Sequence, residues 1–381
     1  KLLLMLWQEA DINKLIKVLI AILLVGCVNE KDLTPDAIAQ GSLIIDTHID
    51  VPYKLKMQLE YNGSFEDISE KTSLNFDYPK SIKGGLNLPF FSIYLPASTE
   101  EEGTSFILAN ELIDMMDKII EKNPEKFFFV DTSTYLGNLP GQNLIGIAYG
   151  MENGAAIEGK LENVEYFYNK GIRYITLTHS KSNHISDSSY DKNKNWGGLS
   201  EFGKSLIPEM NRIGVIVDIS HVSDDAFMQA IEISKTPVIA SHSSLRHFTP
   251  GWERNVSDEM LIALAKNKGV IQINFGTAFL NDVNDKNKSY DPNTYIHAEV
   301  TDVVDHIDHV VNVVGIDFVG IGSDYDGVGD TLPNGLKDAS SYPNLIAELQ
   351  NRGYSTTDIQ KILGGNFVRV WREVEEYARD N

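Results

Sequence analysis

Five side chains of this sequence have the types and the spacing that a pair of metal ions would need. His48 and Asp50 are one residue apart, so on an extended strand both side chains leave the same face and can hold one cation. His221 and His242 each follow an apolar run and could give two imidazoles to a second cation, while the two oxygens of Glu152 could bridge both ions. Imidazole and carboxylate ligands predict Zn²⁺, with Mn²⁺, Co²⁺ or Fe²⁺ possible on the same ligands. Two such ions would share a bridging hydroxide and polarise a carbonyl, which is chemistry suited to hydrolysis.

Each of these residues also has a purely structural interpretation. A single histidine at a strand end is often a hydrogen-bonded core residue, and Glu152 or Asp324 could cap a helix. The metal hypothesis depends on the whole set, because four histidines, a glutamate and two aspartates all follow apolar runs. The segments concerned are 46–50, 151–153, 178–179, 220–221, 241–242 and 323–324.

The apolar runs themselves indicate the fold that positions these residues. They are short and alternate with longer amphipathic stretches, which is typical of a parallel sheet built from βα units. We count eight runs, at 43–46, 88–95, 144–149, 174–178, 215–219, 238–241, 270–274 and 318–322. Helical patterns lie at 106–122, 164–170, 201–213, 224–234, 258–268 and 299–314, and two more follow the last run, at 341–352 and 356–377.

Eight strands alternating with helices predict a (β/α)8 TIM-like barrel with insertions and extra C-terminal helices. An open doubly wound sheet could be built from the same pattern. The barrel is favoured because it gathers the C-terminal ends of all its strands into one ring, where His48 and Asp324 could meet although they are far apart in sequence. In an open sheet the same residues would be spread along an edge.

Composition limits the partners and the kind of metal site. The 381 residues carry 33 Lys and Arg against 54 Asp and Glu, and a formal charge of −21 is the wrong sign for binding a nucleic acid. Cys27 is the only cysteine, so an intramolecular disulfide and a thiolate zinc site are both excluded.

The N-terminal segment is predicted to direct the chain to a membrane. Lys14 and Lys17 precede an apolar run at 18–25 that is too short to span a bilayer, and residues 24–27 (LVGC) resemble the lipobox of bacterial lipoproteins. We therefore expect a signal peptide at 1–27 with a lipid on Cys27, a tether at 28–42 and one hydrolase domain at 43–381. The chain would be lipid-anchored in the bacterial cell envelope, periplasmic or at the outer membrane. A buried helix with an incidental cysteine is the alternative.

Taken together, the motifs resemble those of the membrane dipeptidases, also called renal dipeptidases, among the amidohydrolase-like barrels. The resemblance runs from about residue 43 to residue 371. It is carried by segments 45–50 (IDTHID), 150–154 (GMENG), 173–180 (RYITLTHS), 197–200 (GGLS), 218–223 (DISHVS), 240–244 (ASHSS), 254–256 (RNV) and 320–327 (GIGSDYDG). Phosphotriesterase-like barrels fit less well, because Asp50 stands where they have a second histidine and Glu152 where they have a carboxylated lysine.

The resemblance implies a zinc-dependent dipeptidase and a role for each matched residue. One zinc would be held by His48, Asp50 and Glu152, and the other by Glu152, His221 and His242. His179 would polarise the scissile carbonyl, Arg254 would bind the terminal carboxylate of the substrate, and Asp324 would contact its amino group and pass a proton to the leaving nitrogen. Dipeptides with an L or a D residue at the C-terminus are both implied as substrates.

Some questions stay open at this point. The family's animal members have disulfides, whereas the only cysteine here lies in the predicted lipobox, so a homodimer would be noncovalent. The dinuclear site could instead serve a lactonase, a phosphotriesterase or an amide deacylase, or the chain could be a non-catalytic barrel lipoprotein. His306 and His309, three apart among Asp302, Asp305 and Asp308, predict a solvated acidic helix face rather than another metal site.

Overall fold

The computed structural model describes residues 33–286 and 288–381. The predicted signal peptide and its lipid-bearing Cys27 lie outside the described residues, as does the first part of the predicted tether. Residues 35–381 form one compact unit. In the described part of the chain, no helix is both long and apolar enough to cross a membrane.

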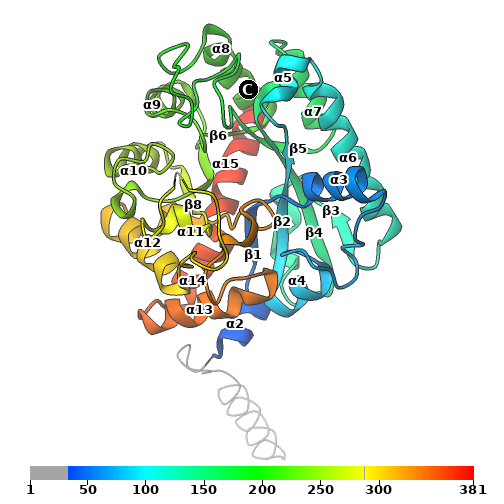
Figure 1. Ribbon diagram of the computed structural model, residues 1–381, viewed down its shortest axis with the longest axis vertical. Coiled ribbons are helices and arrows are strands. Elements are labelled where there is room, and N and C mark those ends of the chain that lie inside the picture. Colours follow the sequence, from blue (N-terminus) through cyan, green and yellow to red (C-terminus); the bar gives the residue numbers. More distant parts are fainter. Residues whose placement is uncertain (1–32, 287) are drawn as a thin grey trace, which may run out of the picture. The chain divides into compact units, whose positions relative to one another are not determined.

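Parallel strands form the centre of this unit, with helices around them (Figure 1). The strands are β1 (Ile44–Ile49), β2 (Leu86–Tyr94), β3 (Phe127–Phe129), β4 (Ile145–Glu152), β5 (Ile172–Thr176), β6 (Ile216–Asp218), β7 (Ile239–Ser243), β8 (Val270–Ile273) and β9 (Val319–Ile321). Their order is β1-β2-β4-β5-β6-β7-β8-β9, and β3 pairs with β4 outside this path. The ends of the sheet meet where Asp50 N donates to Tyr325 O at 2.9 Å and Asp324 N donates to His48 O at 3.0 Å.

All eight predicted apolar runs are strands, and the predicted (β/α)8 barrel is confirmed. Nearly every residue of the eight main strands is buried, because helices cover one side of the sheet and the barrel interior the other. Strand β3 is an addition that the sequence did not predict.

Helices separate most of the strands and stand on the outside of the barrel. Those between strands are α3 (Val51–Asn62), α4 (Tyr78–Gly84), α5 (Ser98–Glu102), α6 (Ser105–Lys122), α7 (Glu162–Asn169), α8 (Glu201–Ile213), α9 (Asp224–Ile233), α10 (Asp258–Lys266), α11 (Thr277–Leu280) and α12 (Val300–Val313). Ser200, Ser223 and Ser257 cap α8, α9 and α10, since each side chain accepts a hydrogen bond from a backbone N–H of the first turn.

The ends of the domain differ from the sequence prediction in two places. Part of the predicted tether is the helix α2 (Pro35–Gly41), in which Ile38 and Ala39 are buried and Gln40 Nε2 donates to Ile82 O at 2.9 Å. The predicted helix 356–377 is divided into α14 (Thr356–Gln360), a π-helical turn at Lys361–Gly365 and α15 (Asn366–Asp380), after α13 (Tyr342–Asn351). Within the predicted tether, residues 35–41 are therefore a docked helix, whose buried side chains Ile38 and Ala39 hold it against the domain.

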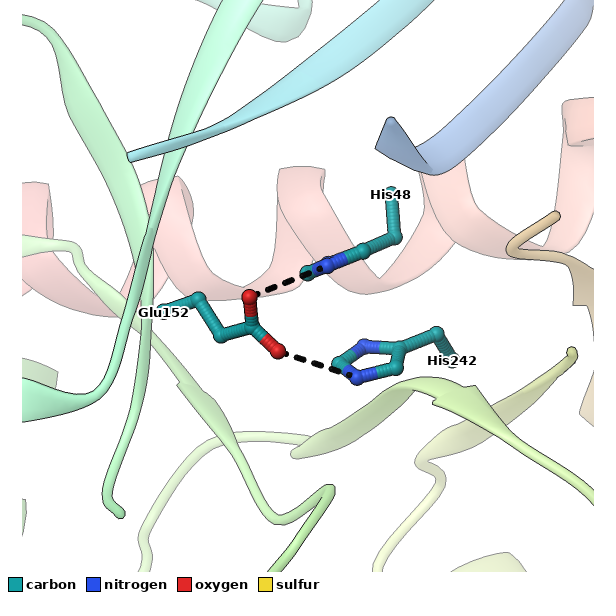
Figure 2. Close-up of side chains that lie close together, drawn as sticks. All are labelled: His48, Glu152 and His242. Carbon is teal, nitrogen blue, oxygen red and sulfur yellow. Dashed lines mark ion pairs between the residues drawn. The ribbon is translucent and has the colours of Figure 1, made fainter. Parts of the chain in front are cut away.

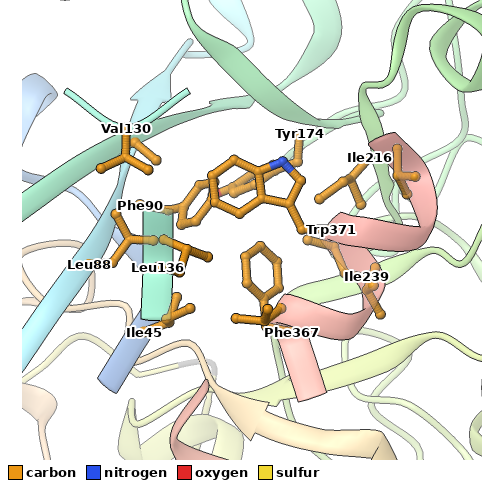
Figure 3. Close-up of a cluster of buried hydrophobic side chains, with 14 of the residues drawn as sticks. Ile45, Leu88, Phe90, Val130, Leu136, Tyr174, Ile216, Ile239, Phe367 and Trp371 are labelled. Carbon is orange, nitrogen blue, oxygen red and sulfur yellow. The ribbon is translucent and has the colours of Figure 1, made fainter. Parts of the chain in front are cut away.

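The core is completed by α15. Phe367 and Trp371 project from this helix among side chains such as Ile45 and Phe90 (Figure 3), and the rings of Phe90 and Trp371 are 5.3 Å apart. Ile216, Ile239 and Val270, the first residues of β6, β7 and β8, belong to the same cluster. The helix therefore fills the end of the barrel where the strands begin, and the opposite end is left for chemistry.

The prediction of a solvated acidic face around His306 was wrong. The His306 ring is fully buried in α12, where Nδ1 accepts from Leu245 N at 3.0 Å and Nε2 donates to Leu280 O at 2.9 Å. Both ring nitrogens are therefore used to hold α12 against the segment that follows β7 and the end of α11. Charge pattern alone did not reveal this, because both partners are backbone groups.

Burial lowers the pKa of His306 from 6.5 to about 4, so the unfolded chain binds a proton there more readily than the folded chain. The stabilisation from this ring is complete above pH 6.5 and declines as the pH falls towards 4. We expect His306→Gln to remove up to about 3 kcal/mol of the acid-induced loss of stability. The measurement is the free energy of unfolding in denaturant across this pH range for both proteins. Parallel curves would contradict the assignment.

Candidate metal centre

The C-terminal ends of the strands bring seven of the eight predicted site residues together. Glu152, the last residue of β4, lies at their centre with 4% of its surface exposed. Its Oε2 is 3.4 Å from His48 Nε2, and its Oε1 is 3.3 Å from His242 Nε2 (Figure 2). Oε1 is also 3.2 Å from His221 Nε2 and 3.4 Å from His179 Nε2.

Each oxygen of Glu152 thus faces a different group of ligands. On the Oε2 side, Asp50 Oδ2 lies 3.5 Å from His48 Nε2, and Ser92 Oγ donates to Oε2 at 3.0 Å. On the Oε1 side, the Nε2 atoms of His221 and His242 are 2.7 Å apart. Two groups of ligands on the two oxygens of one carboxylate are the arrangement expected of a bridging ligand between two cations.

Neighbouring hydroxyl groups orient two of the histidines. Tyr174 OH donates to Thr47 O at 2.9 Å, so it can accept from His48 Nδ1, which is also 2.9 Å away. His48 Nε2 is buried without a hydrogen-bond partner and keeps its lone pair free. In the same way, His242 Nδ1 is 2.8 Å from Ser241 Oγ, which donates to Asp218 Oδ2 at 2.6 Å. Both rings therefore present Nε2 as a ligand atom.

The charges around Glu152 favour an ionised carboxylate there and neutral imidazoles at His221 and His242, as metal binding requires. Burial opposes the charge of Glu152, but the surrounding imidazoles, His48 foremost, hold its pKa well below the ordinary value. Burial lowers the pKa of His221 and of His242 well below the ordinary value, with Arg254 and His48 respectively adding to the effect.

Negative charge accumulates on the Asp50 side of the site. Burial raises the pKa of Asp324 to about 8, and the carboxylate of Asp50 adds to the rise. Burial lowers the pKa of His48, but Tyr174 and Glu152 outweigh it and bring that pKa well above the ordinary value. The site therefore favours a positive charge next to His48 Nε2. A bound cation there would offset the negative charges of Asp50 and Glu152. The residues present fit a pair of divalent ions.

The backbone is strained at several of these positions. His221 and Asp324 have positive φ angles of 69° and 63°, and Asn153, next to Glu152, has one of 76°. Non-glycine residues rarely adopt this conformation, and it is concentrated at functional sites. Gly327 has a related role, because a Cβ there would collide with the carboxylates of both Asp50 and Asp324.

An open cavity of about 710 Å³ lies over these residues. Asp50, Glu152, His179, His221 and Asp324 all line it, which is a size and setting typical of a small-molecule site. One wall is a single face of α3, formed by Tyr53, Lys54, Met57, Gln58, Tyr61 and Asn62. The sequence did not predict α3, so this wall was missed.

Arg254, like His48 and His242, does not line the cavity. It is 3% exposed, its Nη1 donates to Ser243 Oγ at 2.7 Å and its Nη2 donates to His242 O at 2.7 Å. Its guanidinium lies 5.0 Å from the ring of Phe279, which does line the cavity. Arg254 Nε is buried without a partner.

Four partners that hold these groups were not found from the sequence: Ser92, Tyr174, Asp218 and Asn274. Asn274 Nδ2 donates to Asp324 Oδ2 at 2.7 Å. Asn274 directly follows β8, and Asp218 is the last residue of β6, so the strand-end rule that selected the ligands applies to both. Tyr174 and Ser92 lie within strands, so their position in the sequence did not indicate that they contact the site.

A (β/α)8 barrel whose strand ends gather imidazoles and carboxylates around one shared glutamate has the architecture of a metal-binding barrel. More narrowly, the chain belongs to the membrane dipeptidase family, peptidase family M19, whose model matches residues 34–381. The family predicted from the sequence motifs is confirmed.

Relatives with names and solved structures agree with this assignment. The chain is 32% identical to Dipeptidase 3 of Mus musculus over 337 residues, which are 87% of this chain and 64% of the mouse protein. It is 34% identical to Dipeptidase tcpJ of Claviceps purpurea (strain 20.1) over 309 residues, 79% of this chain and 70% of that protein. The crystal structure of the probable dipeptidase PvdM from Pseudomonas aeruginosa has a TM-score of 0.79 at 25% identity, covering 90% of this chain and 98% of that one.

Proposed function

We propose that this chain is a metal-dependent dipeptidase that hydrolyses the peptide bond of dipeptides with an L or a D residue at the C-terminus. The observation that carries the proposal is Glu152, whose two oxygens face different imidazoles beneath an open cavity. Family membership supports the activity. Since the chain spans 64% of the length of the mouse relative, activity and substrates are both part of the proposal.

Two Zn²⁺ ions suit the ligands, and Mn²⁺, Co²⁺ or Fe²⁺ suit the same set. His48, Asp50 and Glu152 would hold one ion, and Glu152, His221 and His242 would hold the other. Two observations support this assignment of ligands to two ions. His48 Nε2 has no hydrogen-bond partner, and the Nε2 atoms of His221 and His242 lie next to each other. When bound, the ions would lower the pKa of water towards neutrality and polarise the scissile carbonyl.

His179 and Asp324 supply the remaining groups for hydrolysis. His179 lies on the cavity side of Glu152 with 20% of its side chain exposed, where its ring can stabilise charge that develops on the carbonyl oxygen. Asp324 Oδ2 accepts a hydrogen bond from Asn274, and the carboxylate lines the cavity next to Asp50, where the substrate's amino group would lie. With cations bound beside it Asp324 would be ionised, so it could accept the proton released by the attacking water and donate it to the leaving nitrogen.

Arg254 would bind the terminal carboxylate of the substrate. One N–H of each Nη atom is held, by Ser243 and by the backbone of His242, and the unpartnered Nε is among the donors that remain. A buried donor without a partner beside the cavity wall at Phe279 is where an anionic group would be stabilised.

Recognition of both ends makes substrate length decisive. We expect L-Ala-L-Ala and L-Ala-D-Ala to be hydrolysed, and kcat/KM to fall by about 10- to 100-fold for a tripeptide and for a dipeptide amide, because each loses one charged contact of about 1.5–3 kcal/mol. The assay compares these peptides and a lactone on one metal-loaded preparation.

Equal turnover of dipeptide and tripeptide would contradict recognition of both termini. Preferred hydrolysis of the lactone would instead support a lactonase. The dipeptide amide serves as the matched control, since it differs from the dipeptide only in the charge that Arg254 would meet.

The same proposal extends to location and assembly. Residues 24–27 (LVGC) after a short apolar run support a lipid on Cys27 and attachment to the cell envelope. Because the only cysteine would carry the lipid, a homodimer would be noncovalent.

A further inference from the structure

A second group of ligating side chains lies apart from the site described above. His247 belongs to the short helical turn Arg246–Phe248 after β7, Asp258 is the first residue of α10, and His309 lies on α12. Each offers a ligand atom, and these atoms all lie within 4.8 Å of one another. Three segments that are distant in sequence thus bring two imidazoles and a carboxylate together at the surface.

We propose that His247, Asp258 and His309 form a further binding site for Zn²⁺ or a similar divalent transition metal. Two imidazoles and one carboxylate are a ligand set that such ions prefer, and calcium or magnesium would prefer oxygen alone. The inference rests on these three side chains and does not require the proposed dipeptidase activity.

The geometry needs little change to accept an ion. His309 Nε2 is 2.9 Å from Asp258 Oδ1, close to the separation of two ligands on one zinc ion. The rings of His247 and His309 are stacked with centroids 4.2 Å apart. An ion would replace the proton shared between His309 and Asp258, and the His309 ring would then carry its proton on Nδ1.

The three side chains are exposed enough for water to complete the coordination of a bound ion. His247 is exposed, while the side chains of Asp258 and His309 are 44% and 18% exposed. The neighbouring His306 is not available as a ligand, since its two nitrogens bind Leu245 N and Leu280 O. Of the pair on α12, only His309 is therefore free to turn towards the ion.

Binding there would fasten a segment that also serves the main site. Residues 245–256 begin at β7, carry His247 and return through Arg254, and the two ends pair as a bridge between Leu245 and Val256. An ion on His247 would fix this segment to α10 and α12. We therefore expect the metal to slow local opening of residues 245–256.

The test counts zinc in the purified full chain after equilibrium dialysis. We expect the wild type to retain about one equivalent more than His247→Phe and His309→Phe, because phenylalanine keeps the stacked ring and lacks the ligand nitrogen. His247→Phe changes an exposed residue, which protects the test from a folding failure. His184→Gln is the matched control: His184 Nδ1 pairs with Glu100 Oε1 at 2.7 Å but has no second imidazole in the described clusters.

Equal zinc content in the wild type and His247→Phe would overturn the proposal, and so would an equal loss in His184→Gln. Hydrogen exchange gives an independent readout. Zinc added beyond the amount that fills the main site should slow exchange in residues 245–256 of the wild type and leave His247→Phe unchanged. Exchange that does not respond to zinc in the wild type would also overturn it.

Discussion

Glu152→Gln is expected to lose at least one metal ion and nearly all hydrolytic activity. The amide has the same shape as the carboxylate, but it carries no charge and offers one oxygen instead of two. It can therefore face the His48 side or the His221 side, and not both. Since metal assistance supplies several kcal/mol of transition-state stabilisation, we expect kcat to fall by about three orders of magnitude or more. Metal analysis and steady-state kinetics on the same sample measure both effects.

Glu158→Gln is the matched control, because Glu158 is an exposed glutamate six residues further along the chain. It should keep its metal content and its activity. A Glu152→Gln protein with full metal content would mean that the carboxylate does not bridge the two ions.

Asp324→Asn is expected to keep its metals and lose most of its turnover. The asparagine oxygen can still accept the hydrogen bond from Asn274 Nδ2, so the side chain should stay in place. An amide cannot carry a proton from the attacking water to the leaving nitrogen, and we expect kcat to fall by about 10²- to 10⁴-fold. Steady-state kinetics with a dipeptide, together with a metal count, separate this effect from metal loss.

The exposed Asp330, on the loop that follows Asp324, supplies the control variant Asp330→Asn, which should behave as the wild type. Unchanged kcat in Asp324→Asn would remove Asp324 from the proposed proton transfer. A loss of metal in the same variant would make Asp324 a ligand instead.

The barrel and the grouping of the site could be predicted from the sequence because both depend on one regular property. Parallel strands are buried on both faces, so they read as short apolar runs, and the first polar residues after each run lie at one end of the barrel. That property alone brought His48, Glu152 and Asp324 into one group.

What could not be predicted depends on contacts that leave no periodic pattern. Tyr174 orients His48 from within a strand, and His306 is fixed by two backbone groups from other segments. The burial of Arg254 could not be predicted either. The sequence motif identifies the arginine, but it does not show whether the side chain lines the cavity or lies behind its wall. The cluster of His247 and His309 with Asp258 was missed for the same reason, since three separate segments form it.

Helix α3 has a consequence for how this fold can diversify. Its preceding residue is Asp50, the proposed ligand, and its far end reaches Tyr61 on the cavity wall, about 16 Å away along the axis at 1.5 Å per residue. One helix thus links the proposed metal site at its first residue to the outer part of the cavity wall at its last turn. Substitutions in the outer turns of α3 can change which substrate side chains fit the cavity, while the residues of the proposed metal site stay unchanged.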